Sequence, residues 1–208
     1  MYFQDRRDAG KKLSLKMAAY HASAHTIVLG LARGGVIVAH ALGQALALPI
    51  DVLCPRKVGA PLNPELAVGA VAEDGSLFLN ENICRHLGLT AEQLAPLVER
   101  AKQESVRKTA LYRNGKPPLD LHNKIVIITD DGLATGATMR AAIAQVKKGK
   151  AKRIILAVPV APPETWEAIR PLVDEGFVLF LPPDFPAVGA YYQDFSSTSD
   201  AEVLSCLH

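Results

Sequence analysis

The segment Ile125–Thr138, IVIITDDGLATGAT, constrains this 208-residue chain more than any other. Its first five residues, IVIIT, form a short and mostly apolar run, which is typical of a fully buried parallel strand. This strand ends at two carboxylates, Asp130 and Asp131, and a loop of small and hydroxyl residues then leads into a predicted helix at 139–146. Loop amides and a helix N-terminus bind phosphate, so this order predicts an anion-binding loop beside a pair of acids.

The two acids would repel a phosphate, so we expect them to face another part of the same ligand, such as sugar hydroxyls or a metal ion. A ribose 5-phosphate, with its diol close to its phosphate, fits this arrangement. The alternative is an ordinary strand-to-helix turn capped by Thr135. The sequence has no GxxxxGK[ST], no GxGxxG after a strand, no GxSxG and no HExxH. A P-loop, a dinucleotide-binding fold, a nucleophile elbow and a zinc-binding HExxH helix are therefore unsupported.

The length of 208 residues allows one domain, which we predict over residues 1–208, and 49% hydrophobic residues are enough for a buried core. A net charge of +2 gives no reason to expect binding to nucleic acid or to an anionic membrane. Cys54, Cys84 and Cys206 lie far apart without a CxxC pair, which indicates a reducing compartment and no disulfides. No apolar run reaches the length of a membrane span, and we expect a cytoplasmic protein.

Predicted strands and helices alternate along the chain, which favours an α/β fold with a parallel sheet and right-handed crossovers. Thr90 with Gln93 predicts a capping box for a long helix, and Ser199 with Glu202 predicts another for a terminal helix. The predicted strands are 26–29, 50–54, 66–71, 125–129, 153–158 and 177–181. The predicted helices are 5–22, 36–47, 91–112, 139–146, 164–173 and a short one after 199.

A second glycine-rich loop, GLARGG at 30–35, also follows a predicted buried strand. Ligands of open α/β sheets bind beyond the carboxyl ends of the strands, so two such loops can grip two ends of one ligand. Arg33 supplies several N–H donors in a fork that suits phosphate. The alternative is a glycine turn that carries a surface arginine.

The segment Asp130–Thr138, DDGLATGAT, resembles the phosphoribosyl-pyrophosphate signature of type I phosphoribosyltransferases. This resemblance implies a parallel-sheet core flanked by helices, at about 24–181, and a small hood formed by the terminal segments 1–23 and 182–208. It implies that Asp130 and Asp131 bind the ribose 2- and 3-hydroxyls, directly or through Mg²⁺. The residues it assigns to the 5-phosphate are Ala134, Thr135, Gly136, Ala137 and Thr138.

In the resembled family, the loop at 30–35 binds pyrophosphate and has a cis peptide bond, here expected at Ala32-Arg33. Ala32, Gly34 and Gly35 would then contact the ligand, and the pair Arg56 and Lys57 would supply further cations. We interpret the glycine- and proline-containing stretch 58–75 as a mobile cover loop, or else as a plain surface loop. The segments RKVGAPLNPELAVGAVAEDG and RNGKPPLDLHNK resemble a bacterial subgroup of predicted phosphoribosyltransferases without an assigned substrate.

The sequence says less about the part of the site that would bind the acceptor base. The segment 182–192 resembles loosely the base-binding segment of hypoxanthine-guanine enzymes, and Phe185 or Tyr191 could stack on a base there. The alternative is that these rings pack the hood against the core. Ala134 stands where 6-oxopurine enzymes of the resembled family carry an acid, and no lysine follows the strand at 153–158, where those enzymes use one. The sequence therefore does not identify the base.

The predicted function is Mg²⁺-dependent transfer of 5-phosphoribosyl from phosphoribosyl pyrophosphate to a nitrogenous base, with release of pyrophosphate. Asp130, Asp131, Arg33 and Lys57 are the predicted catalytic residues. The alternatives are a non-catalytic regulator that senses phosphoribosyl pyrophosphate, and a ribose-phosphate phosphorylase or hydrolase. A homodimer is an open alternative for the oligomeric state.

Overall fold

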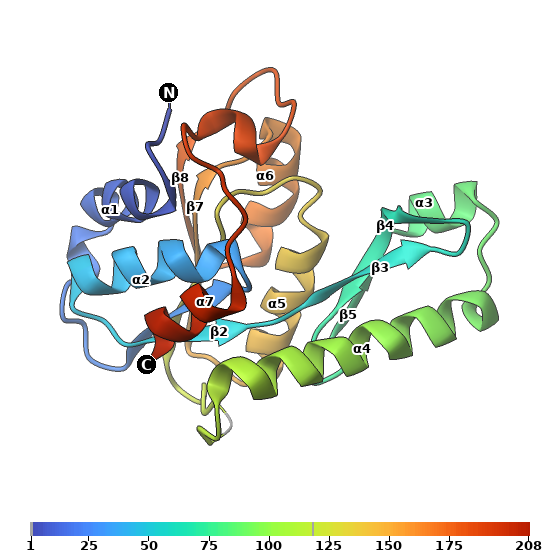
Figure 1. Cartoon of the computed structure of the whole chain (residues 1–208), viewed down its shortest axis with the longest axis horizontal. Coiled ribbons are helices and arrows are strands. Elements are labelled where there is room, and N and C mark those ends of the chain that lie inside the picture. The colour runs from blue at the N-terminus through green and yellow to red at the C-terminus, as the bar shows by residue number, and fades with distance from the viewer. Residues whose placement is uncertain (1, 118) are drawn as a thin grey trace.

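The computed structural model describes residues 2–117 and 119–208 and has a parallel sheet at its centre (Figure 1). The five strands of this sheet follow the order β2-β1-β6-β7-β8, and every neighbouring pair is parallel. Their bounds are β1 Thr26–Leu31, β2 Ile50–Leu53, β6 Ile125–Thr129, β7 Arg153–Val160 and β8 Glu175–Phe180. The predicted parallel α/β fold is therefore confirmed.

Helices cover both faces of the sheet (Figure 1). On one face lie α1 (Arg6–Lys16) and α2 (Gly34–Leu46), and on the other lie α5 (Ala137–Lys148) and α6 (Pro163–Ile169). Successive strand residues point to opposite faces, so Ile127 packs with α1 and α2 whereas Ile128 packs with α5 and α6. Burial on both faces explains why the strands read as nearly continuous apolar runs.

An arm projects from this body and carries a separate antiparallel sheet (Figure 1). Its strands are β3 (Arg56–Ala60), β4 (Asn63–Val71) and β5 (Leu77–Leu79), and its helices are α3 (Glu81–His86) and α4 (Ala91–Arg113). The predicted strand at 66–71 lies within β4 and is confirmed. The rest of the stretch 58–75 was expected to be a loop, and this was wrong at 58–60 and 63–65, which belong to the hairpin of β3 and β4.

Packing explains the hairpin. Val58 and Val68 are buried against Leu94 and Ala101 of α4, so the arm has a small core of its own. Gly59 lies against the backbone of Pro64, where an added Cβ would sit 2.3 Å from the carbonyl oxygen. Glycine there allows close strand contact at a β-bulge, whereas in the sequence it is typical of a loop.

Both predicted capping boxes are present. Thr90 Oγ1 accepts from the N–H of Gln93, and the Gln93 side chain accepts from the N–H of Thr90, at 3.3 and 3.0 Å. Ser199 and Glu202 form the same arrangement at the start of α7 (Asp200–Leu207). Two helices are shorter than expected: α1 is followed by a 3₁₀ turn, η1 (Ala18–Tyr20), and α6 by another, η2 (Arg170–Leu172). Residue 118, within the segment RNGKPPLDLHNK, lies outside the described residues.

The two terminal segments pair with one another beside the sheet. The N–H of Phe3 donates to the carbonyl of Tyr191, the last residue of η3 (Val188–Tyr191), at 2.8 Å. The N–H of Gln193 donates to the carbonyl of Phe3 at 2.8 Å. Phe3 is fully buried, and its ring centroid lies 5.2 Å from that of Tyr192. The segments expected to form a hood are thus joined, and their division from the core as 1–23 and 182–208 stays a prediction.

The three cysteines are buried free thiols. Burial raises the pKa of the Cys54 thiol to about 12, so this thiol stays protonated and packs as a small apolar group. Among the described residues, no helix is long and apolar enough to cross a membrane.

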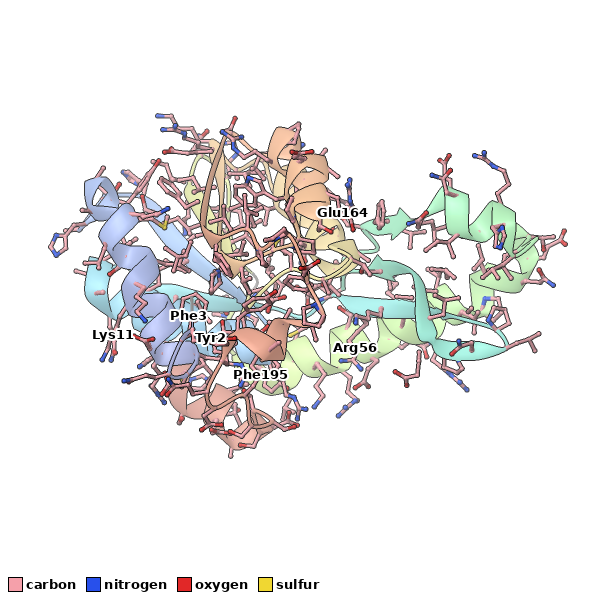
Figure 2. The ribbon with its side chains drawn as sticks, turned by 90° about the horizontal axis from the view of Figure 1, so that it is seen from above. Tyr2, Phe3, Lys11, Arg56, Glu164 and Phe195 are labelled. Atoms are coloured by element: carbon pink, nitrogen blue, oxygen red, sulfur yellow. The ribbon has the colours of Figure 1, made fainter. Side chains whose placement is uncertain are left out.

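We expect Phe3→Ala to lower the free energy of unfolding by about 3–5 kcal/mol, because it empties a fully buried ring site between the two terminal segments. Tyr2→Ala is the matched control: Tyr2 is 66% exposed, and its change should stay within about 0.5 kcal/mol (Figure 2). Urea unfolding of both variants measures this difference. Equal effects would show that the terminal pairing does not stabilise the fold.

Candidate active site

A cavity of about 440 Å³ lies where the carboxyl ends of three strands meet. The sheet order places β1 between β2 and β6, so the segments that follow these strands are neighbours in space. Arg56 lies at the base of the arm, beside this region (Figure 2). The residues that line the cavity are Ala32, Arg33, Gly34, Pro55, Arg56, Lys57, Pro64, Asp130, Asp131 and Thr138.

The structure therefore brings Asp130, Asp131, Thr138 and most of the predicted pyrophosphate residues to one cavity. Gly35 and residues 134–137 are not among the residues that line it. The loop at 134–138 opens α5, and Thr138 lines the cavity. None of its amides donates to a protein acceptor within the described residues. Gly136 has φ 72°, and an added Cβ would lie 2.2 Å from Cδ1 of Ile169, so only glycine fits this turn. The open amides and the helix N-terminus together suit an anion.

The two acids are half-buried and in direct contact, because the N–H of Asp131 donates to Oδ1 of Asp130 at 2.8 Å. Burial raises the pKa of both carboxyls, and the charge of Asp131 raises the pKa of Asp130 further. Lys57 and Arg6 act against this rise in the pKa of Asp130. The acids therefore lie in a poorly solvated place, where a nearby ligand charge or hydroxyl acts strongly on them.

Arg6 is a site residue that sequence reasoning missed. Its Nε donates to Oδ2 of Asp131 at 2.7 Å, and the two side chains are only 12% and 16% exposed. Its guanidinium also lies 4.0 Å from the ring centroid of Phe195 and donates to the carbonyl of Ser196. Arg6 and Asp131 are 125 positions apart, and Arg6 stands among ordinary charged residues at a helix start, so no local pattern indicated the pair.

Gly34 makes room for this ion pair. An added Cβ at Gly34 would lie 2.0 Å from Oδ2 of Asp131 and 2.6 Å from Nε of Arg6. At Gly35 an added Cβ would lie 2.9 Å from Cα of Asp130. Both glycines were expected to let the backbone approach a ligand, and the structure shows that they also let the acids pack on α2.

The C-terminal segment also contacts the signature loop, through Val188 and Tyr192. The hydroxyl of Tyr192 donates to the backbone carbonyl of Asp131 at 2.5 Å. Val188 packs on Gly132 so closely that an added Cβ would lie 2.6 Å from Cγ1 of Val188. Tyr192 was missed at the sequence level, although its neighbour Tyr191 was singled out.

Phe185 and Tyr191 lie in an apolar cluster with Phe3 and Tyr192. Their rings stack with centroids 5.4 Å apart and an interplanar angle of 26°. Tyr191 is buried and donates to the carbonyl of Asp184, whereas Phe185 is half-buried. Both rings thus help to pack the C-terminal segment, and their contact with a base stays a prediction.

At the pyrophosphate end, the Ala32-Arg33 peptide bond is cis, as expected. Arg33 directly precedes α2, so a second helix N-terminus borders the cavity. Arg56 and Lys57 are exposed on β3. Three cations and two acids therefore line the cavity. The acids belong to the segment after β6, and the cations to the segments after β1 and β2.

Comparison with known proteins agrees with this geometry. Residues 7–186 match the model of the family described as phosphoribosyl transferase domain. The chain belongs to this family. The match covers both loops of the site and the arm, so the resemblance of the Asp130–Thr138 signature is confirmed at the level of the family.

Individual proteins and solved structures are also similar to this chain. It is 40% identical over 205 residues to a protein of Mycobacterium tuberculosis that carries the provisional name phosphoribosyl transferase, covering 99% of this chain and 46% of that protein. The chain thus spans about half the length of the curated relatives it matches. The crystal structure of TT1426 from Thermus thermophilus is 39% identical, with a TM-score of 0.82 over 100% of this chain and 98% of that one. A hypoxanthine phosphoribosyltransferase of Staphylococcus aureus has the same fold, at 14% identity and a TM-score of 0.52 over 86% and 74% of the two chains.

We expect Arg6→Met to lower the free energy of unfolding at neutral pH by about 3 kcal/mol, because it leaves Asp131 without its buried cation. Without Arg6 the pKa of Asp131 rises further, so the variant gains more than the wild type when this carboxyl is protonated. The difference in stability should therefore shrink as the pH falls toward about 4. Urea unfolding at both pH values measures it.

The control is Lys11→Met on the exposed side of the same helix, which removes the same charge (Figure 2). It should change stability by less than about 0.5 kcal/mol at either pH. A loss for Arg6→Met that does not depend on pH would contradict the electrostatic explanation and would point to lost packing on Phe195 instead.

Proposed function

We propose that this chain catalyses the Mg²⁺-dependent transfer of 5-phosphoribosyl from phosphoribosyl pyrophosphate to a nitrogenous base, purine-like or pyrimidine-like, with release of pyrophosphate. The observation that carries the proposal is the cavity in which a pair of acids, a group of cations and Thr138, the last residue of an open amide loop, meet. Its parts match the 5-phosphate, the ribose diol and the pyrophosphate of this one substrate.

Each part of the cavity has a defined task. The amides of 134–138 bind the 5-phosphate, and Thr135 and Thr138 add hydroxyl donors. Asp130 and Asp131 accept from the ribose hydroxyls. Arg33, Arg56 and Lys57 bind the pyrophosphate, with Ala32, Gly34 and Gly35 forming the backbone of that loop.

The transfer itself breaks the bond between the ribose C1 and the pyrophosphate oxygen, whose electron pair leaves with pyrophosphate. A nitrogen lone pair of the base forms the new bond to C1, and the nitrogen then loses its proton to solvent or to the leaving group. The cations stabilise the charge that develops on pyrophosphate. The acids stand near the ribose, where the positive charge that develops at C1 favours their anionic forms and is stabilised by them.

The residues present fit a Mg²⁺ ion that arrives with the substrate. Mg²⁺ is usually held by one or two carboxylates, with the remaining positions filled by water and phosphate oxygens. Asp130 and Asp131 supply such carboxylates, and among the described residues there is no cluster of three or more His, Cys, Asp or Glu side chains to bind a metal alone. When bound, Mg²⁺ would neutralise part of the charge on pyrophosphate.

The acceptor would lie across the ribose from the pyrophosphate loop, because displacement at C1 needs the two groups on opposite sides. We place it near Phe185 or Tyr191, which lie in the C-terminal segment that contacts the signature loop. The half-buried ring of Phe185 is the better candidate, since Tyr191 is buried. We also propose a cytoplasmic location, consistent with the three free thiols, and leave a homodimer open.

The two alternatives make different demands on the site. A ribose-phosphate hydrolase needs the phosphate loop and the acids but no second anion position. A phosphorylase needs a second position only for a single phosphate and not a pyrophosphate loop, whereas Arg33, Arg56 and Lys57 offer three cations to a larger anion. A regulator needs binding without turnover. Pyrophosphate release, screened over candidate bases with phosphoribosyl pyrophosphate and Mg²⁺, separates the three functions.

We expect the double variant Asp130→Asn, Asp131→Asn to keep its fold and to lower turnover by about 100-fold or more, which corresponds to roughly 3 kcal/mol of transition-state stabilisation. Pyrophosphate release with the best base from the screen measures turnover. Circular dichroism checks the fold. The matched control changes two exposed acids of the arm helix, Glu92→Gln and Glu99→Gln, and should turn over at the wild-type rate. Normal turnover by the aspartate variant would remove both acids from the mechanism.

A further inference from the structure

A second cavity, of about 230 Å³, adjoins the first on the side of α4. The two cavities share Ala32, Arg33, Pro55 and Arg56 in their walls. The second cavity adds Lys108, which is 17% exposed, and Tyr112, which is buried. Its wall thus contains three cations, Arg33, Arg56 and Lys108, and no acid, so it attracts anions.

One anion of the chain itself already sits at these donors. Asp200, the first residue of α7, has one carboxylate oxygen 2.6 Å from Nζ of Lys108. Its other oxygen accepts from the hydroxyl of Tyr112 at 2.6 Å and lies 3.8 Å from Nη1 of Arg33. The hydrogen bonds from Lys108 and Tyr112 lower the pKa of Asp200, so its side chain is a carboxylate anion at neutral pH. Donors from α4 and from the loop after β1 therefore converge on a single negative group.

We propose that Lys108 and Tyr112 belong to the pyrophosphate-binding site. In the free protein the carboxylate of Asp200 accepts their hydrogen bonds, and pyrophosphate displaces it on binding. The inference rests on the proposed function, because it extends the leaving-group end of the same substrate site. Arg33 and Arg56 border both cavities, so an anion of two phosphates held by them in the first cavity reaches toward the second.

Charge and exposure favour the exchange. Pyrophosphate carries several negative charges, whereas Asp200 carries one, and charge-assisted hydrogen bonds strengthen with the charge of the acceptor. The Asp200 side chain is 39% exposed, so its carboxylate can turn to water at modest cost. Ser199 and Glu202 cap α7 without Asp200, so the helix keeps its N-terminal hydrogen bonds when the Asp200 carboxylate moves away from Lys108 and Tyr112.

A purely structural role makes the opposite prediction for one variant. If Asp200 only anchors α7 to α4, replacing it should loosen the C-terminal helix and weaken or leave unchanged the binding of pyrophosphate. If it competes with pyrophosphate, Asp200→Asn should strengthen that binding, because it removes the competing charge and keeps the shape.

Isothermal titration calorimetry with inorganic pyrophosphate, and separately with ribose 5-phosphate, tests the inference. We expect Lys108→Met to weaken pyrophosphate binding about 10-fold, Tyr112→Phe to weaken it about 3-fold, and Asp200→Asn to strengthen it at least about 3-fold. Affinity for ribose 5-phosphate, which does not reach the second cavity, should change by less than about 2-fold in all three. Lys102→Met is the control: it removes the same charge from α4 outside both cavities and should leave both affinities unchanged.

The outcomes separate the two proposals. Opposite effects of Lys108→Met and Asp200→Asn on pyrophosphate alone support the inference. If the wild type binds both ligands and neither variant alters pyrophosphate affinity, or if Asp200→Asn weakens it, the inference is overturned and the proposed function stands. If the wild type binds neither ligand, both are overturned.

Discussion

The ion pair between Arg6 and Asp131, packed on Gly34, is the contact on which the rest of the site depends. It joins the N-terminal helix, the loop after β1 and the signature loop after β6 at one point. Two half-buried carboxylates at 130 and 131 would repel each other, and the guanidinium of Arg6 offsets part of that repulsion. The site thus needs the terminal segment for electrostatic as well as for packing reasons.

This arrangement gives Gly34 and Gly35 a second structural role. Gly34 and Gly35 stand in a loop that the resemblance assigns to pyrophosphate, and backbone access for a ligand is sufficient reason for them. The structure adds a second reason, because a side chain at either position would collide with Asp131 or Asp130. One short loop therefore positions the acids on one side and offers Arg33 to an anion on the other.

Local patterns predicted most of the body of the fold. The runs at 26–29 and 125–129 are buried on both faces, and Thr90 with Gln93 is a self-contained hydrogen-bonding unit, so each can be recognised without knowing the rest of the chain. The arm was misjudged because Gly59 and Pro64 are typical of loops, whereas contacts with α4 make this stretch a hairpin. Arg6 and Tyr192 were missed for a related reason: their roles come from contacts with Asp131 that join distant parts of the chain.

The central claim is that one substrate spans the cavity, with its phosphate on the amides of 134–138 and its diol at Asp130 and Asp131. A crystal structure of the protein with ribose 5-phosphate tests it most directly. The account predicts phosphate oxygens within hydrogen-bond distance of those amides and the two ribose hydroxyls beside the acids. A phosphate bound at Arg33 and Lys57 instead, with the amides of 134–138 left open, would contradict it.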